Sequence, residues 1–253
     1  MNPSGNTILI TGGGSGIGRG LAQALHALGN QVIIADRRKR ALDETAAANP
    51  GMRAFLLDVD DPAAIRAFAT QITAEFPSLN GLFNNAGIMR PENLLARHDH
   101  LADAEAIIST NLLGPIRLTA ALLPLLQRQP SATILNVSSG LAFVPMAFVP
   151  TYCATKAAIH SYTQSLRFQL KSTQVEVLEL IPPYVATDLM GDASEDPRAM
   201  PLSEFIAEVI AILKTQPTPA EICVDRVKGL RLAAELGGYD ITFNGLNSVV
   251  DVH

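Results

Sequence analysis

The chain has 253 residues, of which 48% are hydrophobic and 17% are charged, and its formal net charge is −5. This balance excludes a disordered chain, and the negative charge provides no electrostatic footprint for nucleic acid or an anionic membrane surface. The N-terminus lacks the apolar core of a signal peptide, and the densest apolar run, residues 120–126, is too short to span a bilayer. Two cysteines form no disulfide framework, which is typical of a reducing cytoplasm, and neither has metal-ligand spacing with a histidine.

The first part of the chain is predicted to form a strand, a glycine-rich turn, a helix and a second strand. The strands are predicted at residues 7–11 and 31–35, and the helix at residues 19–28. This unit places a pyrophosphate on the N-terminus of a helix, and glycines let backbone N–H groups approach it closely. The predicted contact residues are Gly12, Ser15, Gly16, Ile17 and Gly18, with the spacing GxxxGxG rather than GxGxxG.

Asp36 ends the second strand, about 20 residues beyond the turn. A carboxylate there can accept both hydroxyls of an adenosine ribose and repels a 2′-phosphate, which predicts NAD as the cofactor. Arg37 and Arg38 favour NADP instead, because a guanidinium can pair with its 2′-phosphate. Both arginines could instead lie on the surface of the following helix. NAD is therefore the predicted cofactor, and NADP is the alternative.

The middle of the chain contains further strands, predicted at residues 53–59, 79–84 and 132–137. A helical pattern over residues 101–127 is interrupted by Pro115. Because proline has no N–H, the carbonyl four positions earlier, that of Asn111, loses its helical partner. We expect this carbonyl to be free to hold a water; the alternative is a kink that serves packing only.

Tyr152 and Lys156 stand four residues apart on a helix predicted over residues 150–171, so they share one face. A free phenol has a pKa near ~10, and a neighbouring cation lowers it. Taken alone, a solvated Tyr–Lys pair is the better interpretation of this short pattern. Ser139 makes a functional site the better interpretation, because it follows a predicted strand at the edge where open α/β sheets bind ligands.

Taken together, these segments resemble the short-chain dehydrogenase/reductase family over nearly the whole chain. The resemblance rests on the turn at residues 11–18, on Asn84-Asn85-Ala86-Gly87 and on Asn111, Ser139 and Tyr152-x-x-x-Lys156 in the family's order and spacing. It implies a single domain over residues 1–253, with an α/β fold of the Rossmann type. The doubly wound parallel sheet would have seven strands in the order 3-2-1-4-5-6-7 and helices on both faces.

The resemblance implies that Ser139, Tyr152 and Lys156 are catalytic, together with Asn111, whose carbonyl holds a water in a proton relay. Ser139 would stabilise the substrate oxygen, Tyr152 would act as general acid or base, and Lys156 would lower the Tyr152 pKa. Tyr152 and Lys156 would also contact the cofactor, and Lys156 would hold the nicotinamide ribose. Further cofactor contacts are implied for Asp58, Val59, Asn85, Ala86, Gly87, Pro182, Val185 and Thr187.

One departure from the family is Pro183, where its members usually have Gly, and this makes the turn more rigid. Together with residues 243–247 (FNGLN), the Pro-Pro pair resembles the branch labelled DltE-like oxidoreductases, which specifies no substrate. The small-molecule substrate is predicted to be uncharged and largely apolar, although about half of the apolar residues between Ser139 and Tyr152 would pack under their loop. The residues predicted to face it are Leu141, Met146, Tyr184 and Met190.

The C-terminal third is predicted to add strands at residues 175–181 and 221–224 and helices at residues 202–213 and 227–236. His160, two turns beyond Tyr152, is interpreted as a core or interface residue. The resemblance implies a homodimer formed through the helices at residues 101–127 and 151–171, with a homotetramer as the alternative.

The predicted function is hydride transfer between a nicotinamide cofactor and a secondary alcohol or ketone, with no nucleic acid, membrane or metal involved. Two alternatives belong to other classes. A dinucleotide-sensing binding protein without turnover is disfavoured by the intact Ser139, Tyr152, Lys156 and Asn111 set. A SAM-dependent methyltransferase is disfavoured by the glycine turn combined with the YxxxK pattern.

Overall fold

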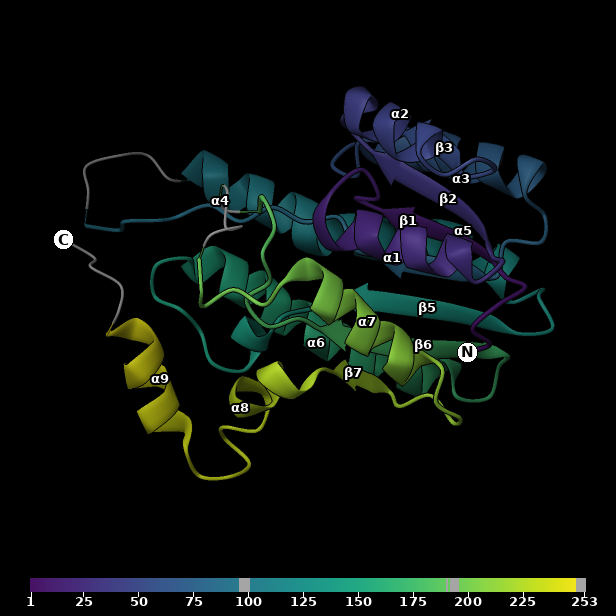
Figure 1. The fold of residues 1–253 in the computed structure, drawn as a ribbon. Coiled ribbons are helices and arrows are strands. Elements are labelled where there is room, and N and C mark those ends of the chain that lie inside the picture. Colours follow the sequence, from purple (N-terminus) through teal and green to yellow (C-terminus); the bar gives the residue numbers. More distant parts are fainter. Residues whose placement is uncertain (96–100, 190, 192–195, 249–253) are drawn as a thin grey trace.

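The computed structural model describes residues 1–95, 101–189, 191 and 196–248. Seven strands form one parallel sheet in the order β3-β2-β1-β4-β5-β6-β7, as predicted (Figure 1). The strands are β1 (Thr7–Thr11), β2 (Gln31–Asp36), β3 (Arg53–Leu56), β4 (Gly81–Asn84), β5 (Ala132–Val137), β6 (Val175–Ile181) and β7 (Glu221–Cys223).

Helices cover both faces of the sheet, because the inner strands are apolar on both sides. In β1, Ile8 and Ile10 pack into the core under one set of helices, and Leu9 packs into the core on the opposite face. The first set is α1 (Gly16–Ala27), α2 (Lys39–Ala47) and α7 (Leu202–Leu213), with α1 and α7 in front in Figure 1. The second set is α3 (Pro62–Glu75), α5 (Gly114–Leu126) and α6 (Pro150–Leu170).

The parallel register brings the carboxyl ends of the inner strands to one edge. Thr11 is level with Ala35, Asn84 with Asn136, and Val137 with Leu180. After β1 the sheet grows first toward β2 and β3 and then, from β4, in the opposite direction, so a crevice opens at this change of direction. The predicted site residues follow these strand ends.

The helical segment Leu101–Leu126 comprises α4 (Leu101–Ile108), a π turn η1 (Ser109–Leu113) and α5. By length and composition it could cross a membrane, unlike the shorter apolar run singled out in the sequence. Its buried side chains Leu118, Leu122 and Leu125 pack in the core between α3 and the sheet, as expected of a core helix.

The fold differs from the prediction at β3 and in the C-terminal segment. β3 ends at Leu56, because the Asp58 carboxylate accepts the Asp60 N–H at 3.0 Å and turns the chain. The helix expected over residues 227–236 is reduced to η3 (Asp225–Val227) and α8 (Lys228–Arg231), followed by turns up to Gly237. A final helix, α9 (Tyr239–Asn247), was not predicted from the sequence, and it buries none of its residues (Figure 1).

Candidate active site

A single cleft of about 1000 Å³ follows the carboxyl edge of the sheet. This volume lies at the upper end of the roughly 300–1000 Å³ typical of ligand sites. The predicted residues that line it are Gly12, Ser15, Gly16, Ile17, Asp36, Arg37, Asp58, Val59, Asn85, Ala86, Gly87, Ser139, Leu141, Met146, Tyr152, Lys156, Pro182, Tyr184, Val185 and Thr187. Gly18 and Asn111 lie behind its walls, and Met190 lies outside the described residues.

The turn after β1 closes because glycines occupy two of its positions. Gly12 has a φ of +67°, and a Cβ there would lie 2.9 Å from Asn85 Nδ2. A Cβ on Gly18 would lie 2.3 Å from the Gly12 carbonyl oxygen, so Gly18 closes the turn instead of lining the cleft. Asn85 Nδ2 donates to the Thr11 carbonyl at 2.9 Å, which joins the two segments predicted to bind cofactor.

The N-terminus of α1 is suited to an anion. Gly16 and Ile17, its first two residues, line the cleft, and the unpaired N–H groups of a helix start carry partial positive charge. The first turn of this fully described helix contains no acidic residue that would repel a phosphate. The pyrophosphate of a dinucleotide fits this place.

The Pro182-Pro183 turn preserves the predicted position of Thr187. The Gly140 N–H donates to the Pro182 carbonyl at 2.9 Å, which fixes the turn to the segment after β5. Thr187 faces the glycine-rich turn, because a Cβ on Gly16 would lie 3.4 Å from Thr187 Cγ2. The proline in place of glycine therefore leaves this wall of the cleft in its expected position.

Asp36 is 6% exposed and is held by Arg38. Arg38 donates from Nε to Oδ1 at 3.0 Å and from Nη2 to Oδ2 at 2.9 Å, and its backbone N–H donates to Oδ1. Burial alone raises the pKa of the Asp36 carboxyl, but its contacts with Arg38 outweigh burial and hold this pKa below its usual value. Arg38 also donates to Ser15 Oγ at 2.8 Å and so ties Asp36 to the glycine turn, while Arg37, the arginine predicted to contact the cofactor, lines the same cleft.

Ser139, Tyr152 and Lys156 converge beyond the end of β5. Lys156 Nζ donates to the Val137 carbonyl at 2.8 Å and lies 5.5 Å from the centroid of the Tyr152 ring. Ser139 Oγ accepts the Leu141 N–H at 3.1 Å, so its own proton remains available for donation. All three predicted catalytic residues are buried, with exposed fractions of 5–7%, yet they line the cleft.

Burial is the largest effect on the pKa values of Tyr152 and Lys156. It raises the pKa of the Tyr152 phenol, which contact with Ser139 lowers in part and Cys153 raises further. It also lowers the pKa of Lys156 to about 8, against the attraction of the Glu179 carboxylate. The net direction for Tyr152 is therefore opposite to the sequence-based prediction, because desolvation of the phenolate is the largest effect on its pKa.

Asn111 lies in the π turn η1, and Pro115 lies in the next helix, α5. The Gly114 N–H bonds the Ser109 carbonyl five residues earlier, a geometry that is frequent at functional sites. The buried Asn111 side chain accepts from Ile88 N and donates to Ile88 O and to Thr155 Oγ1. A Cβ on Gly87 would lie 3.3 Å from Asn111 Oδ1 and 3.8 Å from Lys156 Nζ, so Asn111 and Lys156 flank the same backbone.

The far end of the cleft is apolar, and α9 contributes to it. Leu141 and Met146 line this end as predicted, together with Leu246 from α9, which sequence reasoning missed. Asn247 fixes α9 in place: its Oδ1 accepts the Ala147 N–H at 2.6 Å, and its Nδ2 donates to the Pro145 carbonyl at 3.1 Å. The signal available in the sequence was the FNGLN segment, but only the fold places it against the loop between Ser139 and Tyr152.

Comparison with known proteins shows which family has this fold and sequence. Residues 6–198 match the model of the short chain dehydrogenase family. The chain is 39% identical to "Uncharacterized oxidoreductase DltE" of Bacillus subtilis (98% of this chain, 99% of the relative) and 32% identical to the 3-oxoacyl-[acyl-carrier-protein] reductase FabG of Escherichia coli (82% and 84%). The 3-ketoacyl-(acyl-carrier-protein) reductase from Brucella melitensis, solved with NADH, superposes with a TM-score of 0.78 at 26% identity (88% and 99%).

The fold and the cleft define a nucleotide-binding α/β protein with a Ser–Tyr–Lys cluster at the strand ends. The chain belongs to the short chain dehydrogenase family of oxidoreductases, and its similarity to the Bacillus relative covers almost the full length of both chains.

Proposed function

We propose that this protein transfers a hydride between a nicotinamide dinucleotide and a secondary alcohol or ketone of a largely apolar substrate. The observation that carries the proposal is the single cleft, which joins the anion-binding start of α1 and Asp36 to Ser139, Tyr152 and Lys156. The NADH complex of the Brucella relative supports the cofactor class. When bound, the nicotinamide supplies or accepts the hydride.

The chain's own residues then move the proton. Because burial raises the Tyr152 pKa, this phenol carries its proton at neutral pH and can act as the general acid of ketone reduction. Ser139 can donate to the substrate oxygen as negative charge develops on it. Lys156 uses one of its three donors on Val137, which leaves two for the ribose hydroxyls that the family resemblance assigns to it.

The Asn111 carbonyl is proposed to hold the water that returns protons to Lys156. Asn111 lies in the π turn, where the regular four-residue bonding pattern is interrupted and Pro115 provides no N–H, and its side chain contacts Thr155, next to Lys156 in sequence. A structure with cofactor bound tests this step: an Asn111 carbonyl without a water linked to Lys156 would remove it from the mechanism.

The function is tested by a screen of alcohols and ketones with both cofactors, followed at the absorbance of reduced nicotinamide. Turnover of a secondary alcohol or ketone is expected. Titrations with NADH, NADPH and SAM accompany the screen, and binding of neither dinucleotide would overturn the proposal. Dinucleotide binding without turnover of any substrate would favour a sensing protein instead.

NAD is proposed as the preferred cofactor because the buried Asp36 carboxylate repels a 2′-phosphate. We expect Asp36→Ala to lower kcat/KM for NAD⁺ about 10- to 100-fold and to raise it for NADP⁺, because Arg38 is released from its ion pair. The matched variant Asp36→Asn keeps the shape and loses the charge. The ratio of kcat/KM for the two cofactors is the measurement, and a wild-type protein that prefers NADP⁺ would mean that Arg38 outweighs Asp36.

The apolar end of the cleft is proposed to hold the body of the substrate. Leu246→Ala removes apolar contact surface, so the KM for an apolar substrate is expected to rise about tenfold with an unchanged KM for the cofactor. Ile241→Ala is the control, because Ile241 lies on the same helix and is 80% exposed. An unchanged substrate KM in Leu246→Ala, or an equal rise in both variants, would show that α9 does not contact the substrate.

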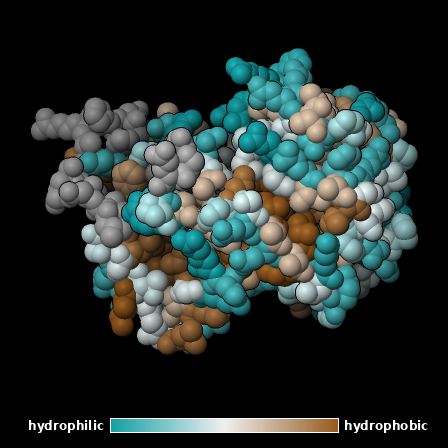
Figure 2. Space-filling view, viewed as in Figure 1, coloured by the Kyte–Doolittle hydropathy of each residue, from teal (hydrophilic) through white to brown (hydrophobic). Residues whose placement is uncertain are grey.

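The homodimer, with the homotetramer as alternative, and the cytoplasmic location stay predictions. Large apolar side chains on the predicted dimer helices support the dimer: Phe168 of α6 is 69% exposed and Ile108 of α4 is 40% exposed. Figure 2 also shows apolar surface in the region of α8 and α9, where Leu236 and Ile241 are exposed. Light scattering gives the mass in solution, and a monomer would contradict the prediction.

A further inference from the structure

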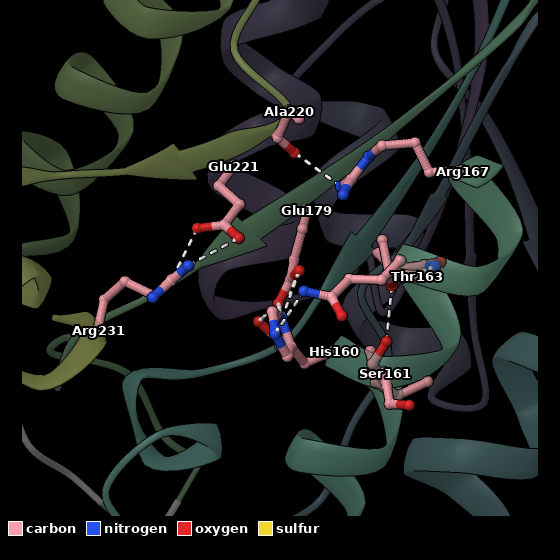
Figure 3. Close-up of polar contacts among 12 residues, drawn as sticks. His160, Ser161, Thr163, Arg167, Glu179, Ala220, Glu221 and Arg231 are labelled. Atoms are coloured by element: carbon pink, nitrogen blue, oxygen red, sulfur yellow. Dashed lines mark hydrogen bonds and ion pairs between the residues drawn. The ribbon is translucent and has the colours of Figure 1, made fainter. Parts of the chain in front are cut away.

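A fully buried carboxylate, that of Glu179 in β6, lies behind the predicted catalytic residues. Its Oε1 accepts the Ser138 hydroxyl at 2.5 Å. Both of its oxygens lie 2.9–3.0 Å from His160 Nδ1 (Figure 3). Burying a carboxylate is costly unless it is paired and hydrogen-bonded. Val177, two residues earlier on the same face of the strand, is apolar and packs in the core, so a carboxylate at position 179 is a departure from its surroundings.

Both partners of Glu179 are adjacent to catalytic positions. Ser138 stands between Val137, whose carbonyl holds Lys156, and Ser139. His160 lies one turn beyond Lys156 on α6, in the row formed by Tyr152, Lys156 and His160. Glu179 is therefore linked to the site through the end of β5 and through α6.

The charges around Glu179 leave it without a strong cation of its own. Arg231 of α8 binds both oxygens of Glu221 of β7, at 2.7 and 3.1 Å (Figure 3). Arg167 of α6 donates instead to the carbonyls of Val177 and Ala220. Within the described ranges, Glu179 has no lysine or arginine at ion-pair distance, and the Cys223 thiol of β7, whose pKa is raised mainly by burial, is the remaining titratable group nearby.

A metal ion is a less suitable occupant of this cluster. Ligand atoms of His160, Glu179 and Glu221 lie within 4.8 Å of one another, which would suit a cation by distance. However, the Arg231 guanidinium already supplies positive charge to Glu221, and Ser138 and His160 already bind Glu179. Beyond these partners, the negative charge of Glu179 also acts on Lys156, whose pKa it raises.

We propose that Glu179 is a positioning residue of the reaction: its buried negative charge favours the protonated form of Lys156, and its hydrogen bond with Ser138 fixes the strand end that carries Ser139. This inference rests on the proposed function. Opposite charge favours the charged form of a buried group, and the attraction of Glu179 is the effect that opposes the loss of the Lys156 proton on burial.

The test replaces the charge and keeps the shape, with Glu179→Gln. Lysine labelled with ¹³C at Cε reports the protonation of Lys156 by NMR without cofactor or substrate, and Lys156→Met identifies its signal. The midpoint is expected near pH 8 in the wild type and about one pH unit lower in Glu179→Gln. The fall of kcat/KM at high pH is expected to move by the same amount.

Two control variants separate charge from packing. Glu221→Gln removes a carboxylate from the same cluster, and Arg231 retains Glu235 as a partner, so the Lys156 midpoint is expected to stay unchanged. Ser138→Ala removes the hydrogen bond and leaves the Glu179 charge, so kcat is expected to fall while the midpoint does not. If Glu179→Gln does not fold, His160→Leu/Glu179→Met replaces the pair with apolar side chains, a change that is often tolerated.

An unchanged Lys156 midpoint in a folded charge-removal variant would overturn the inference, as would an equal fall in Glu221→Gln or Ser138→Ala. The NMR midpoint needs no turnover, so it separates this inference from the proposed function. A lowered midpoint in a protein that oxidises no alcohol and reduces no ketone would preserve the electrostatic role of Glu179 and reject only the proposed reaction.

Discussion

Replacing Tyr152 with phenylalanine is expected to lower kcat about 10²- to 10⁴-fold, the range for loss of a general acid–base group. The variant removes the phenol oxygen that contacts Ser139 and retains the ring, which packs with Ile107 and Val149. The fold is therefore expected to stay that of the wild type, and the dissociation constant for NADH is expected to rise at most about tenfold, the cost of one lost hydrogen bond. Steady-state rates and a fluorescence titration with NADH measure the two quantities.

Tyr162→Phe is the matched control for this prediction. Tyr162 lies on the same helix and contacts Thr119, and it does not line the cleft. Its loss is expected to leave turnover unchanged. Near-normal turnover by Tyr152→Phe, on a substrate that the wild type converts, would remove Tyr152 from the mechanism. Equal losses in both variants would attribute the effect to helix packing.

Replacing Lys156 with methionine is expected to abolish most turnover and, at the same time, to stabilise the protein at neutral pH. Burial lowers the Lys156 pKa from its ordinary 10.5 to about 8. This difference corresponds to about 3 kcal/mol of destabilisation from the charged form, and the variant loses about 1 kcal/mol of it again because the Val137 carbonyl is left without its donor. A net gain of about 2 kcal/mol in the free energy of unfolding raises the Tm by roughly 5 °C.

The stabilisation is expected to depend on pH in a defined direction. The unfolded chain retains the Lys156 proton up to about pH 10.5, and the folded protein loses it near pH 8. The penalty is therefore complete below about pH 8 and disappears as the pH rises to 10.5. Lys156→Met should exceed the wild type in Tm at pH 7 and lose this advantage by pH 10, as followed by thermal melts.

Lys171→Met controls for a simple loss of charge, because Lys171 caps the same helix from an exposed position. Its effect on Tm is expected to be small at every pH. A lower Tm for Lys156→Met at pH 7, or a pH-independent difference from the wild type, would contradict the burial of a charged Lys156. Stability gained with activity lost is the pattern expected of a residue retained for function.

The strands and most of the cleft could be predicted from local patterns, and the order of the strands from the family resemblance. Apolar runs such as residues 132–137 identify buried strands, and the βαβ repeat constrains them to parallel pairing with the carboxyl ends at one edge. Once the edge is fixed, residues that follow strand ends, such as Asp36 and Ser139, must lie near one another. Their convergence in one cleft confirms this reasoning.

The pKa values of the site residues and the segment that lines the apolar end of the cleft could not be predicted in the same way. The pKa of Tyr152 depends on how much water the fold removes from it, which no spacing of residues reports. The Glu179–His160 pair joins residues 19 positions apart in sequence, and Asn247 contacts a loop about 100 positions earlier. α9 buries none of its residues, and the contacts of Asn247 with the loop fix its position.

The sequence by itself determined the nucleotide-binding fold, the edge of the sheet that carries the site and the identity of Ser139, Tyr152 and Lys156 as candidates. The strands and the nucleotide-binding turn follow from local periodicity and from the steric demand for glycine, whereas the catalytic roles of these three residues follow from the family resemblance. Tertiary structure alone decided which arginine binds Asp36, which direction burial moves the Tyr152 pKa, and which segment closes the substrate end. Those outcomes depend on desolvation and on contacts between distant segments, and both arise only when the chain is folded.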